Sequence, residues 1–169
     1  MESFHRFGGV APKVMSLELL KEITNNFSKE RVLGRGTFGT VYKGVQDGEE
    51  IAVKLLHLTR GQDDLSQFMK EFDNLRRLRH QNVVLLLGYC YEIKSEFVDY
   101  GEKLIRAENI YRALCFEYLH NRSLQRHLHD EYHGLDWQTR YKIIKGTCEG
   151  LKYLHEGTGK SYVPFGFET

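Results

Sequence analysis

The sequence predicts an α+β fold, in which an antiparallel five-stranded sheet packs against one amphipathic helix and leads into further helices. The first observation is a series of short runs of β-forming residues that are separated by turn residues. The second is a stretch between the third and fourth runs where apolar residues recur at steps of three and four, the period of a helix. The predicted strands span residues 30–36, 40–46, 50–57, 83–91 and 111–119, and the helix spans residues 63–78.

A glycine-rich stretch joins the first two predicted strands. Gly34, Gly36 and Gly39 stand at the spacing G-x-G-x-x-G, which lets a backbone turn tightly and bring its N–H groups close to phosphate oxygens. A dinucleotide-binding turn would open into a helix, with an acidic residue about 20 positions later. Here β-forming residues keep the chain extended as far as Asp47-Gly48, a hairpin turn signal. The pattern favours a strand–loop–strand lid over phosphate groups rather than a Rossmann or Walker A turn.

Size and composition suit an ordinary globular chain. Its 169 residues are the length of one domain, and 41% hydrophobic with 12% aromatic residues is enough for a packed core. The formal net charge is +1, from 24 basic and 23 acidic residues, so no bulk field draws the chain to nucleic acid or a membrane. No apolar run is long enough to span a bilayer, and the amino terminus has no apolar signal segment. We expect a cytoplasmic protein with no membrane segment and no nucleic-acid partner.

Cysteines and histidines do not suggest a metal site. Cys90, Cys115 and Cys148 are far apart and lie in apolar runs, which favours buried, reduced thiols over metal or disulfide roles. Four histidines cluster between residues 120 and 133, but residues two apart on a helix point to different faces. No carboxylate or thiol completes a tetrahedral set there, so a solvated helix is favoured and no metal ligands are expected.

Three segments flank or interrupt the predicted sheet. Residues 1–15 are aperiodic and are predicted to be a flexible lead-in. Ser16 is the expected N-cap of a short helix that ends at Asn25-Asn26. Residues 92–109 are charged and aperiodic, and they are either a surface insertion or a lengthened connection between the last two strands.

Two helices are predicted after the sheet. Asn121 or Ser123 can cap a short one, and Asp136 caps a long one that Gly157 ends. The long helix carries an apolar stripe at steps of four and three, which would normally lie buried in a helical lobe. The stripe consists of Trp137, Tyr141, Ile144, Cys148, Leu151 and His155.

Several motifs, in order, resemble those of the plant receptor-like protein kinase family of serine/threonine type. They are LGRGTFGTVYKG, IAVK, FMKEF, RHQNVVLLLGYC, LCFEYLHNRSL and GLDWQTRYKIIKGTCEGLKYLHEG, and they cover roughly residues 16–157. The resemblance implies a protein-kinase-like N-lobe, with a five-stranded sheet and a glutamate-bearing helix, followed by the hinge and the first helices of the C-lobe only. It also implies ATP with Mg²⁺ and phosphoryl transfer to serine or threonine hydroxyls.

The resemblance also divides the chain. It implies a flexible lead-in at 1–15, a pre-kinase helix at 16–29, a partial kinase domain at 30–157 and a tail without family likeness at 158–169. Within the partial domain, the expected parts are the N-lobe at 30–115, the hinge at 116–121 and the start of the C-lobe at 122–157.

Matching the motifs residue by residue implies roles for the site. Lys54 matches the phosphate-binding lysine, and Glu71 matches the helical glutamate that pairs with it. Phe116 matches the gatekeeper, and main-chain groups of Glu117 and Leu119 match those that bind the adenine edge. The implied nucleotide-binding residues are Leu33, Gly34, Gly36, Gly39, Val41, Ala52, Lys54, Glu117 and Leu119. The alternatives are a solvated carboxylate at Glu71 and a plain buried strand that ends in a loop.

The resemblance stops where the family's catalytic machinery begins. The family continues into a catalytic loop with an aspartate and an asparagine, and then into an aspartate that holds Mg²⁺. This sequence has no aspartate after Asp136 and no asparagine after Asn121, so the catalytic set is expected to be incomplete, with Lys54 and Glu71 as a supporting pair. We expect weak nucleotide binding that Mg²⁺ does not strengthen, and no phosphoryl transfer by this chain alone.

A second class of function stays open. A kinase-like N-lobe with an exposed apolar helix could be a non-catalytic interaction module, a decoy or scaffold that docks onto full-length kinases or their substrates. Residues 158–169 could also be the translated edge of an intron or a shifted frame, in which case the chain is a gene-model fragment of a full kinase.

Overall fold

The computed structural model describes residues 11–57, 64–101, 103–121, 123–128 and 134–156. Within these ranges a six-stranded sheet forms, in the order β1-β5-β6-β4-β3-β2. The strands from β2 to β6 pair antiparallel, as predicted. The additional strand, β1 (Lys13–Val14), pairs parallel with β5 at Gly88 and Tyr89. The α+β fold class is therefore confirmed, with one strand more than the sequence indicates.

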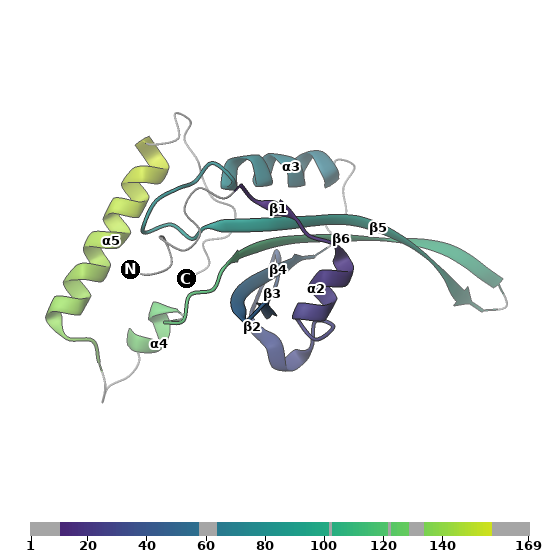
Figure 1. The fold of residues 1–169 in the computed structure, drawn as a ribbon, viewed down its shortest axis with the longest axis horizontal. Coiled ribbons are helices and arrows are strands. Elements are labelled where there is room, and N and C mark those ends of the chain that lie inside the picture. Colours follow the sequence, from purple (N-terminus) through teal and green to yellow (C-terminus); the bar gives the residue numbers. More distant parts are fainter. Residues whose placement is uncertain (1–10, 58–63, 102, 122, 129–133, 157–169) are drawn as a thin grey trace.

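The elements follow the predicted runs, with shifts at their ends. The other strands are β2 (Val32–Gly36), β3 (Gly39–Gln46), β4 (Glu49–Leu56), β5 (Leu86–Tyr100) and β6 (Lys103–Glu117). The helices are α2 (Leu17–Ile23), α3 (Asp64–Leu75), α4 (Leu124–Leu128) and α5 (Trp137–Glu156), with a 3₁₀ turn, η1, at Lys29–Arg31. Figure 1 shows α2 and α3 on opposite faces of the sheet and α5 beyond one end of it.

The turn between β3 and β4 forms where its sequence places it. Asp47 and Gly48 both have positive φ, 51° and 81°, as a two-residue hairpin turn of the mirror-image type requires. The flanking Gln46 and Glu49 pair in register. This corner is determined locally, because aspartate and glycine tolerate the left-handed region better than other residues.

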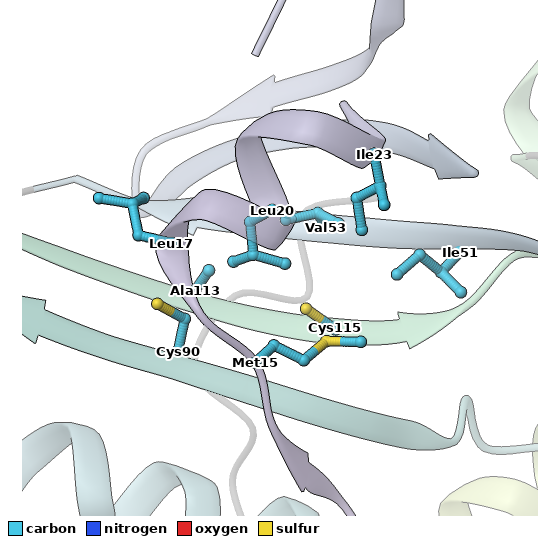
Figure 2. Packing of buried hydrophobic residues seen from close by; sticks show 9 residues of the cluster. All are labelled: Met15, Leu17, Leu20, Ile23, Ile51, Val53, Cys90, Ala113 and Cys115. Carbon is cyan, nitrogen blue, oxygen red and sulfur yellow. The ribbon is translucent and has the colours of Figure 1, made fainter. Parts of the chain in front are cut away.

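Helix α2 is part of the hydrophobic core. The hydroxyl of Ser16 accepts a hydrogen bond from the N–H of Leu19 at 3.2 Å, which is the predicted cap. Below the cap, Leu17 and Leu20 are almost completely buried against the sheet. The cluster consists of Met15, Leu17, Leu20, Ile23, Ile51, Val53, Cys90, Ala113 and Cys115 (Figure 2). Burying a leucine in this way stabilises a fold by about 1.5–3 kcal/mol relative to exposure.

The predicted flexible lead-in extends too far. Lys13 lies in β1, and Met15 is buried with its N–H donating to the carbonyl of Tyr89 at 2.8 Å. The carbonyl oxygen of Lys13 lies so near Gly88 that a Cβ there would be 2.7 Å from it. A two-residue strand leaves no periodic pattern in the sequence, and its partner lies far along the chain. Residues 1–10 are outside the described part.

A second core lies under α3. Phe68 and Phe72 project from the helix onto the sheet, where they join Leu86 and Leu114. The rings of Phe68 and Tyr91 lie 5.6 Å apart between centroids, within the range of favourable aromatic pairs. The predicted helical stripe is therefore buried along its middle.

Residues 92–100 and 103–109 belong to strands β5 and β6. β5 and β6 pair from Gly88–Cys115 to Tyr100–Lys103, so the segment lengthens the hairpin, one of the two interpretations that the sequence leaves open. Neighbouring strands reach only its base, because β1 pairs with β5 no further than Tyr89 and β4 pairs with β6 no further than Ala113. In Figure 1 the hairpin extends past the ends of α2 and α3.

Helix α5 presents its predicted apolar stripe to solvent rather than burying it. In the described part of the chain, Trp137 is 74% exposed and Tyr141 is 58% exposed. The helix packs instead through another face, where Gly150 and Leu154 are buried and Gly146 and Gly150 both lie against Asn82. A Cβ on Gly150 would stand 3.0 Å from the carbonyl oxygen of Asn82, so the contact depends on this glycine.

The cysteine prediction is correct for two of three residues. Cys90 and Cys115 are buried and free, and burial raises the pKa of each thiol to about 12. Cys148 is free but exposed, because it belongs to the uncovered stripe of α5. Among the helices that the structure describes, none has the length and hydropathy to cross a membrane.

Candidate nucleotide-binding site

The glycine-rich stretch forms a tight hairpin between β2 and β3. Gly36 pairs with Gly39, which leaves Thr37 and Phe38 at the tip. β3 then passes so close to β4 that a Cβ on Gly39 would lie 2.5 Å from the carbonyl oxygen of Leu55. This separation is impossible for a real side chain, so the lid reaches its place only with glycine here.

Two more predicted lid residues lie on β2. Gly34 follows a register shift after Val32, and a Cβ on Gly34 would meet no atom within 4 Å. Leu33, inside the shift, is 39% exposed. This part of β2 is therefore open to solvent, and a side chain at position 34 would meet no steric barrier.

His57, which the sequence reasoning missed, holds the tip of the lid. Its N–H donates to the carbonyl of Phe38 at 3.0 Å, and its Nδ1 lies 3.3 Å from the carbonyl oxygen of Thr37. Its Nε2 lies 3.3 Å from the hydroxyl of Thr40. The Nδ1 contact is a hydrogen bond only when Nδ1 carries a proton. No sequence pattern marks His57, because a histidine directly after a strand fits many surroundings.

Lys54 and Glu71 lie on facing elements. Lys54 pairs in register with Val41 on β3 and with Leu114 on β6, and Leu114 belongs to the core under α3. Because paired residues share one face of a sheet, the side chain of Lys54 is on the α3 side. Burial, the largest influence, raises the pKa of the Glu71 carboxyl, while the charge of Lys54 acts in the opposite direction. Since no ion pair within 4 Å joins them in the described ranges, their direct contact stays a prediction.

Arg112 is a second residue that the sequence reasoning missed. It lies on β6 with 5% exposure, and its Nη2 donates to the carbonyl of His57 at 2.7 Å. After Lys54, its charge is the other influence that lowers the pKa of Glu71. The only sign of it in the sequence is a single basic residue just before the apolar run from Ala113 to Phe116. Such a residue usually marks the exposed end of a strand, so it does not indicate a buried cation. The guanidinium thus links the end of β4 electrostatically to the glutamate of α3.

β6 ends in the predicted hinge. Phe116 lies opposite Ala52 of β4, on the same face as Lys54. The N–H of Glu117 donates to the carbonyl of Leu85 at 3.0 Å, and the N–H of Leu85 donates to Oε1 of Glu117 at 2.9 Å. The N–H of Glu117 is therefore engaged, so its carbonyl and the main chain of Leu119, which is 53% exposed, are what an adenine edge could meet.

No metal site is evident in the described ranges, since no three histidine, cysteine or carboxylate side chains there gather as a metal ion would need. The side chains in these ranges do not fit Mg²⁺ ligation. A shallow hollow is lined by His80, Glu149, Lys152, Tyr153 and Glu156, none of them a predicted nucleotide-binding residue.

Comparisons with known proteins agree with this geometry. Residues 27–159 match the family described as protein kinase domain. The cysteine-rich receptor-like protein kinase 28 of Arabidopsis thaliana is 45% identical over 146 residues, which are 85% of this chain and 19% of that protein. The receptor-like serine/threonine-protein kinase SD1-7 of the same plant is 44% identical over 146 residues, 85% of this chain and 15% of its own length. The chain thus spans less than a fifth of either relative.

A glycine lid, a strand lysine and a facing helix glutamate on one sheet define the N-lobe of a protein kinase. The chain belongs to the protein kinase domain family, and its relatives are plant receptor-like serine/threonine kinases. The matched residues begin at 27, after strand β1 and after helix α2, which covers the other face of the sheet.

We predict that Gly39→Ala destabilises the fold, because the new Cβ must displace the Leu55 carbonyl. The expected loss in free energy of unfolding is about 1–3 kcal/mol, as for other overpacked sites. Urea denaturation measures this loss, and Gly34→Ala, which meets open space, is the matched control. Equal stability of the two variants would contradict the close approach of β3 and β4.

We also predict that Glu71→Gln changes how stability depends on pH. Burial raises the pKa of this carboxyl above its ordinary value of 4.5, so the folded chain holds the proton more tightly than the unfolded chain does. The stability of the unmodified chain therefore falls as pH rises from that ordinary value through the raised one. Glutamine cannot ionise, so the melting temperature of the variant minus that of the unmodified chain should increase through this window.

Thermal unfolding between about pH 4 and about pH 8 measures the Glu71 effect. Glu22→Gln, on the exposed side of α2, is the control for loss of a carboxylate. A difference in melting temperature that shrinks as pH rises would mean that the two cations outweigh burial.

Proposed function

We propose that this chain binds ATP as the N-lobe of a receptor-like serine/threonine protein kinase. The observation that carries the proposal is the placement of Lys54 on the α3 face, under a lid that only Gly39 allows, with its charge acting on Glu71. An ammonium held in this way attracts the α- and β-phosphates, while lid N–H groups bind phosphate oxygens.

The adenine would lie against the same face of the sheet. Val41 and Ala52 supply apolar surface there, and Phe116 stands opposite Ala52 at the end of β6. The carbonyl of Glu117 can accept from the exocyclic amine of adenine, and the main chain of Leu119 offers the next contact along the hinge. Val41, Ala52 and these main-chain groups would orient the base, while Lys54 would fix the phosphates.

We infer that these 169 residues alone do not transfer a phosphoryl group. ATP in this family is used with Mg²⁺, which neutralises phosphate charge, and this sequence holds no aspartate after Asp136 to ligate it or to accept the proton of a hydroxyl. Loss of one general acid–base role lowers a rate by about 10² to 10⁴. Loss of the metal lowers the rate further.

Thermal-shift titration with ATP, with and without Mg²⁺, tests both inferences. We expect weak stabilisation that Mg²⁺ does not increase, and a dissociation constant about tenfold larger for Lys54→Ala, because a charge-assisted hydrogen bond is lost. Arg35→Ala, on the exposed surface of the lid, is a control for general loss of positive charge. Tight binding that Mg²⁺ strengthens, or phosphate incorporation that Lys54→Ala abolishes, would refute the proposal of an incomplete site.

A second candidate function is that of an interaction module. The observation that favours it is the apolar stripe of α5, where Ile144 is 57% and Leu151 46% exposed beside Trp137 and Tyr141. Exposed apolar surface of this kind is typical of docking sites. In this proposal the stripe binds a full-length kinase of the same family, and the chain acts as a decoy or scaffold.

Binding to a purified receptor-like kinase separates the two candidates. We expect Tyr141→Glu to weaken a docking interaction severalfold, because it places a charge in the stripe, and Lys54→Ala to leave the interaction unchanged. Lys142→Glu, exposed on the same helix, controls for charge alone. If Lys54→Ala abolished binding instead, the interaction would depend on nucleotide rather than on the stripe.

We infer a cytoplasmic setting for the chain. Its three cysteines are free in the described structure, and Cys148 is exposed, which suits a reducing compartment.

A further inference from the structure

The outer part of the β5–β6 hairpin is not explained by nucleotide binding. We call residues 93–100 and 103–110 the arm. Their strands pair with each other from Ile93–Ile110 to Tyr100–Lys103. Among the described residues, no strand pairs with the outer edge of the arm between Leu104 and Glu108, since β4 reaches β6 only at Ala113. Figure 1 shows the arm projecting beyond both helices that cover the sheet.

The arm carries apolar side chains that nothing in the described structure covers. Phe97 is 69% exposed, Leu104 is 63%, Ile93 is 53% and Ile105 is 43%. Phe97, Leu104 and Ile93 share the face on which α3 lies further back, because the register places them on one side of the hairpin. An isolated two-stranded ribbon is only marginally stable in water, and apolar exposure makes an additional strand favourable.

The outer edge of β6 is complementary to itself. Around Ala107 the sequence reads Leu104, Ile105, Arg106, Ala107, Glu108, Asn109 and Ile110. If two such strands pair antiparallel about Ala107, Arg106 stands opposite Glu108 of the other copy, twice. Leu104 likewise stands opposite Ile110, twice. Opposite charges and apolar residues in facing positions stabilise a strand pair, whereas like charges destabilise it.

We propose that the arm is a dimerisation element that pairs with the arm of a second copy of this chain through the β6 edge. The product is a four-stranded antiparallel sheet with a two-fold axis at Ala107. Arg106 and Glu108 lie 3.7 Å apart within one strand, and Nη2 of Arg106 also donates to the hydroxyl of Ser95 at 2.8 Å. Their side chains are 64% and 60% exposed, so both remain accessible to a partner. The charges that would normally protect an edge strand from pairing are here arranged to select an identical edge.

Backbone geometry fits this pairing. Residues that flank a two-residue hairpin loop form a hydrogen-bonded pair, here Tyr100 and Lys103. Every second residue from Leu104 onward then directs its N–H and C=O away from β5. In the self-pairing about Ala107, Leu104, Arg106 and Glu108 meet outward-facing groups of the other copy. The axis residue Ala107 is small, which keeps the non-hydrogen-bonded centre free of crowding.

The β5 side of the arm is less suited to the same role. Glu92 accepts a hydrogen bond from the N–H of Leu17 at 2.7 Å, and Lys94 pairs with Glu18 at 2.7 Å. These contacts tie the start of that strand to α2. The β6 edge carries its opposite charges next to the symmetry point, so it is the edge that a second copy fits.

Light scattering coupled to size-exclusion chromatography of the full chain, over a wide range of concentration, tests the proposal. We expect a concentration-dependent dimer. Arg106→Glu and Glu108→Arg should each raise the dimer dissociation constant about tenfold or more, because two facing pairs change from opposite to like charge. The double exchange Arg106→Glu with Glu108→Arg should restore the dimer, since each new charge again faces its opposite.

A crosslink tests the register independently. In a Cys148→Ser background, which removes the exposed native thiol, Ala107→Cys should form an intermolecular disulfide under mild oxidation, because facing Cα atoms at the axis lie within disulfide reach. Asp99→Cys, exposed on the β5 side of the arm, should not.

Three results would overturn the proposal. They are a monomer at every concentration, single charge reversals that leave the dimer intact, and single reversals whose effect the double exchange does not repair. If Tyr141→Glu in α5 dissolved a dimer that the arm variants leave unchanged, the interface would be the α5 stripe instead. Neither activity nor nucleotide enters these measurements, so the dimer can stand or fail apart from ATP binding.

Discussion

The position of the Glu71 carboxylate is the constraint on which the rest of the site depends. The side chain projects from α3 and is half-buried, so its ionisation is unfavourable. Cations on two different strands, Lys54 on β4 and Arg112 on β6, act against this effect of burial. The carboxylate keeps its place near these cations only if α3 stays packed on the sheet through Phe68 and Phe72. The lid tip belongs to the same arrangement, because Arg112 binds the carbonyl of His57 and His57 contacts the tip. Packing and charge at this site therefore support each other.

The sheet is covered on both faces, and the two covers have different origins. α3 lies within the residues that match the protein kinase domain, whereas α2 precedes them. Both nonetheless bury fully enclosed side chains, Phe68 on one side and Leu20 on the other. The N-terminal segment is thus as much a part of the folded lobe as the helix that carries the glutamate.

Local signals in the sequence predict much of this structure. The Asp47-Gly48 turn, the Ser16 cap and the stripe of α3 depend on neighbouring residues, and each forms as expected. Interactions between distant residues are where prediction fails, because a two-residue strand such as β1 carries no pattern of its own. The same holds for the site, where glycine spacing and the motif around Lys54 reveal the lid, but His57 and Arg112 acquire roles only through tertiary contacts.

The pairing of β1 with β5 and the packing of α2 on the sheet determine where the folding unit begins. A polypeptide started at residue 27, where the family match begins, would leave Val53, Cys90 and Cys115 facing water instead of Leu17 and Leu20. Hydrophobic surface of that extent invites aggregation and makes two inert thiols open to oxidation. The smallest part of this lobe that can fold by itself therefore starts near Lys13. The boundary of the family match at residue 27 differs from the boundary of the hydrophobic core.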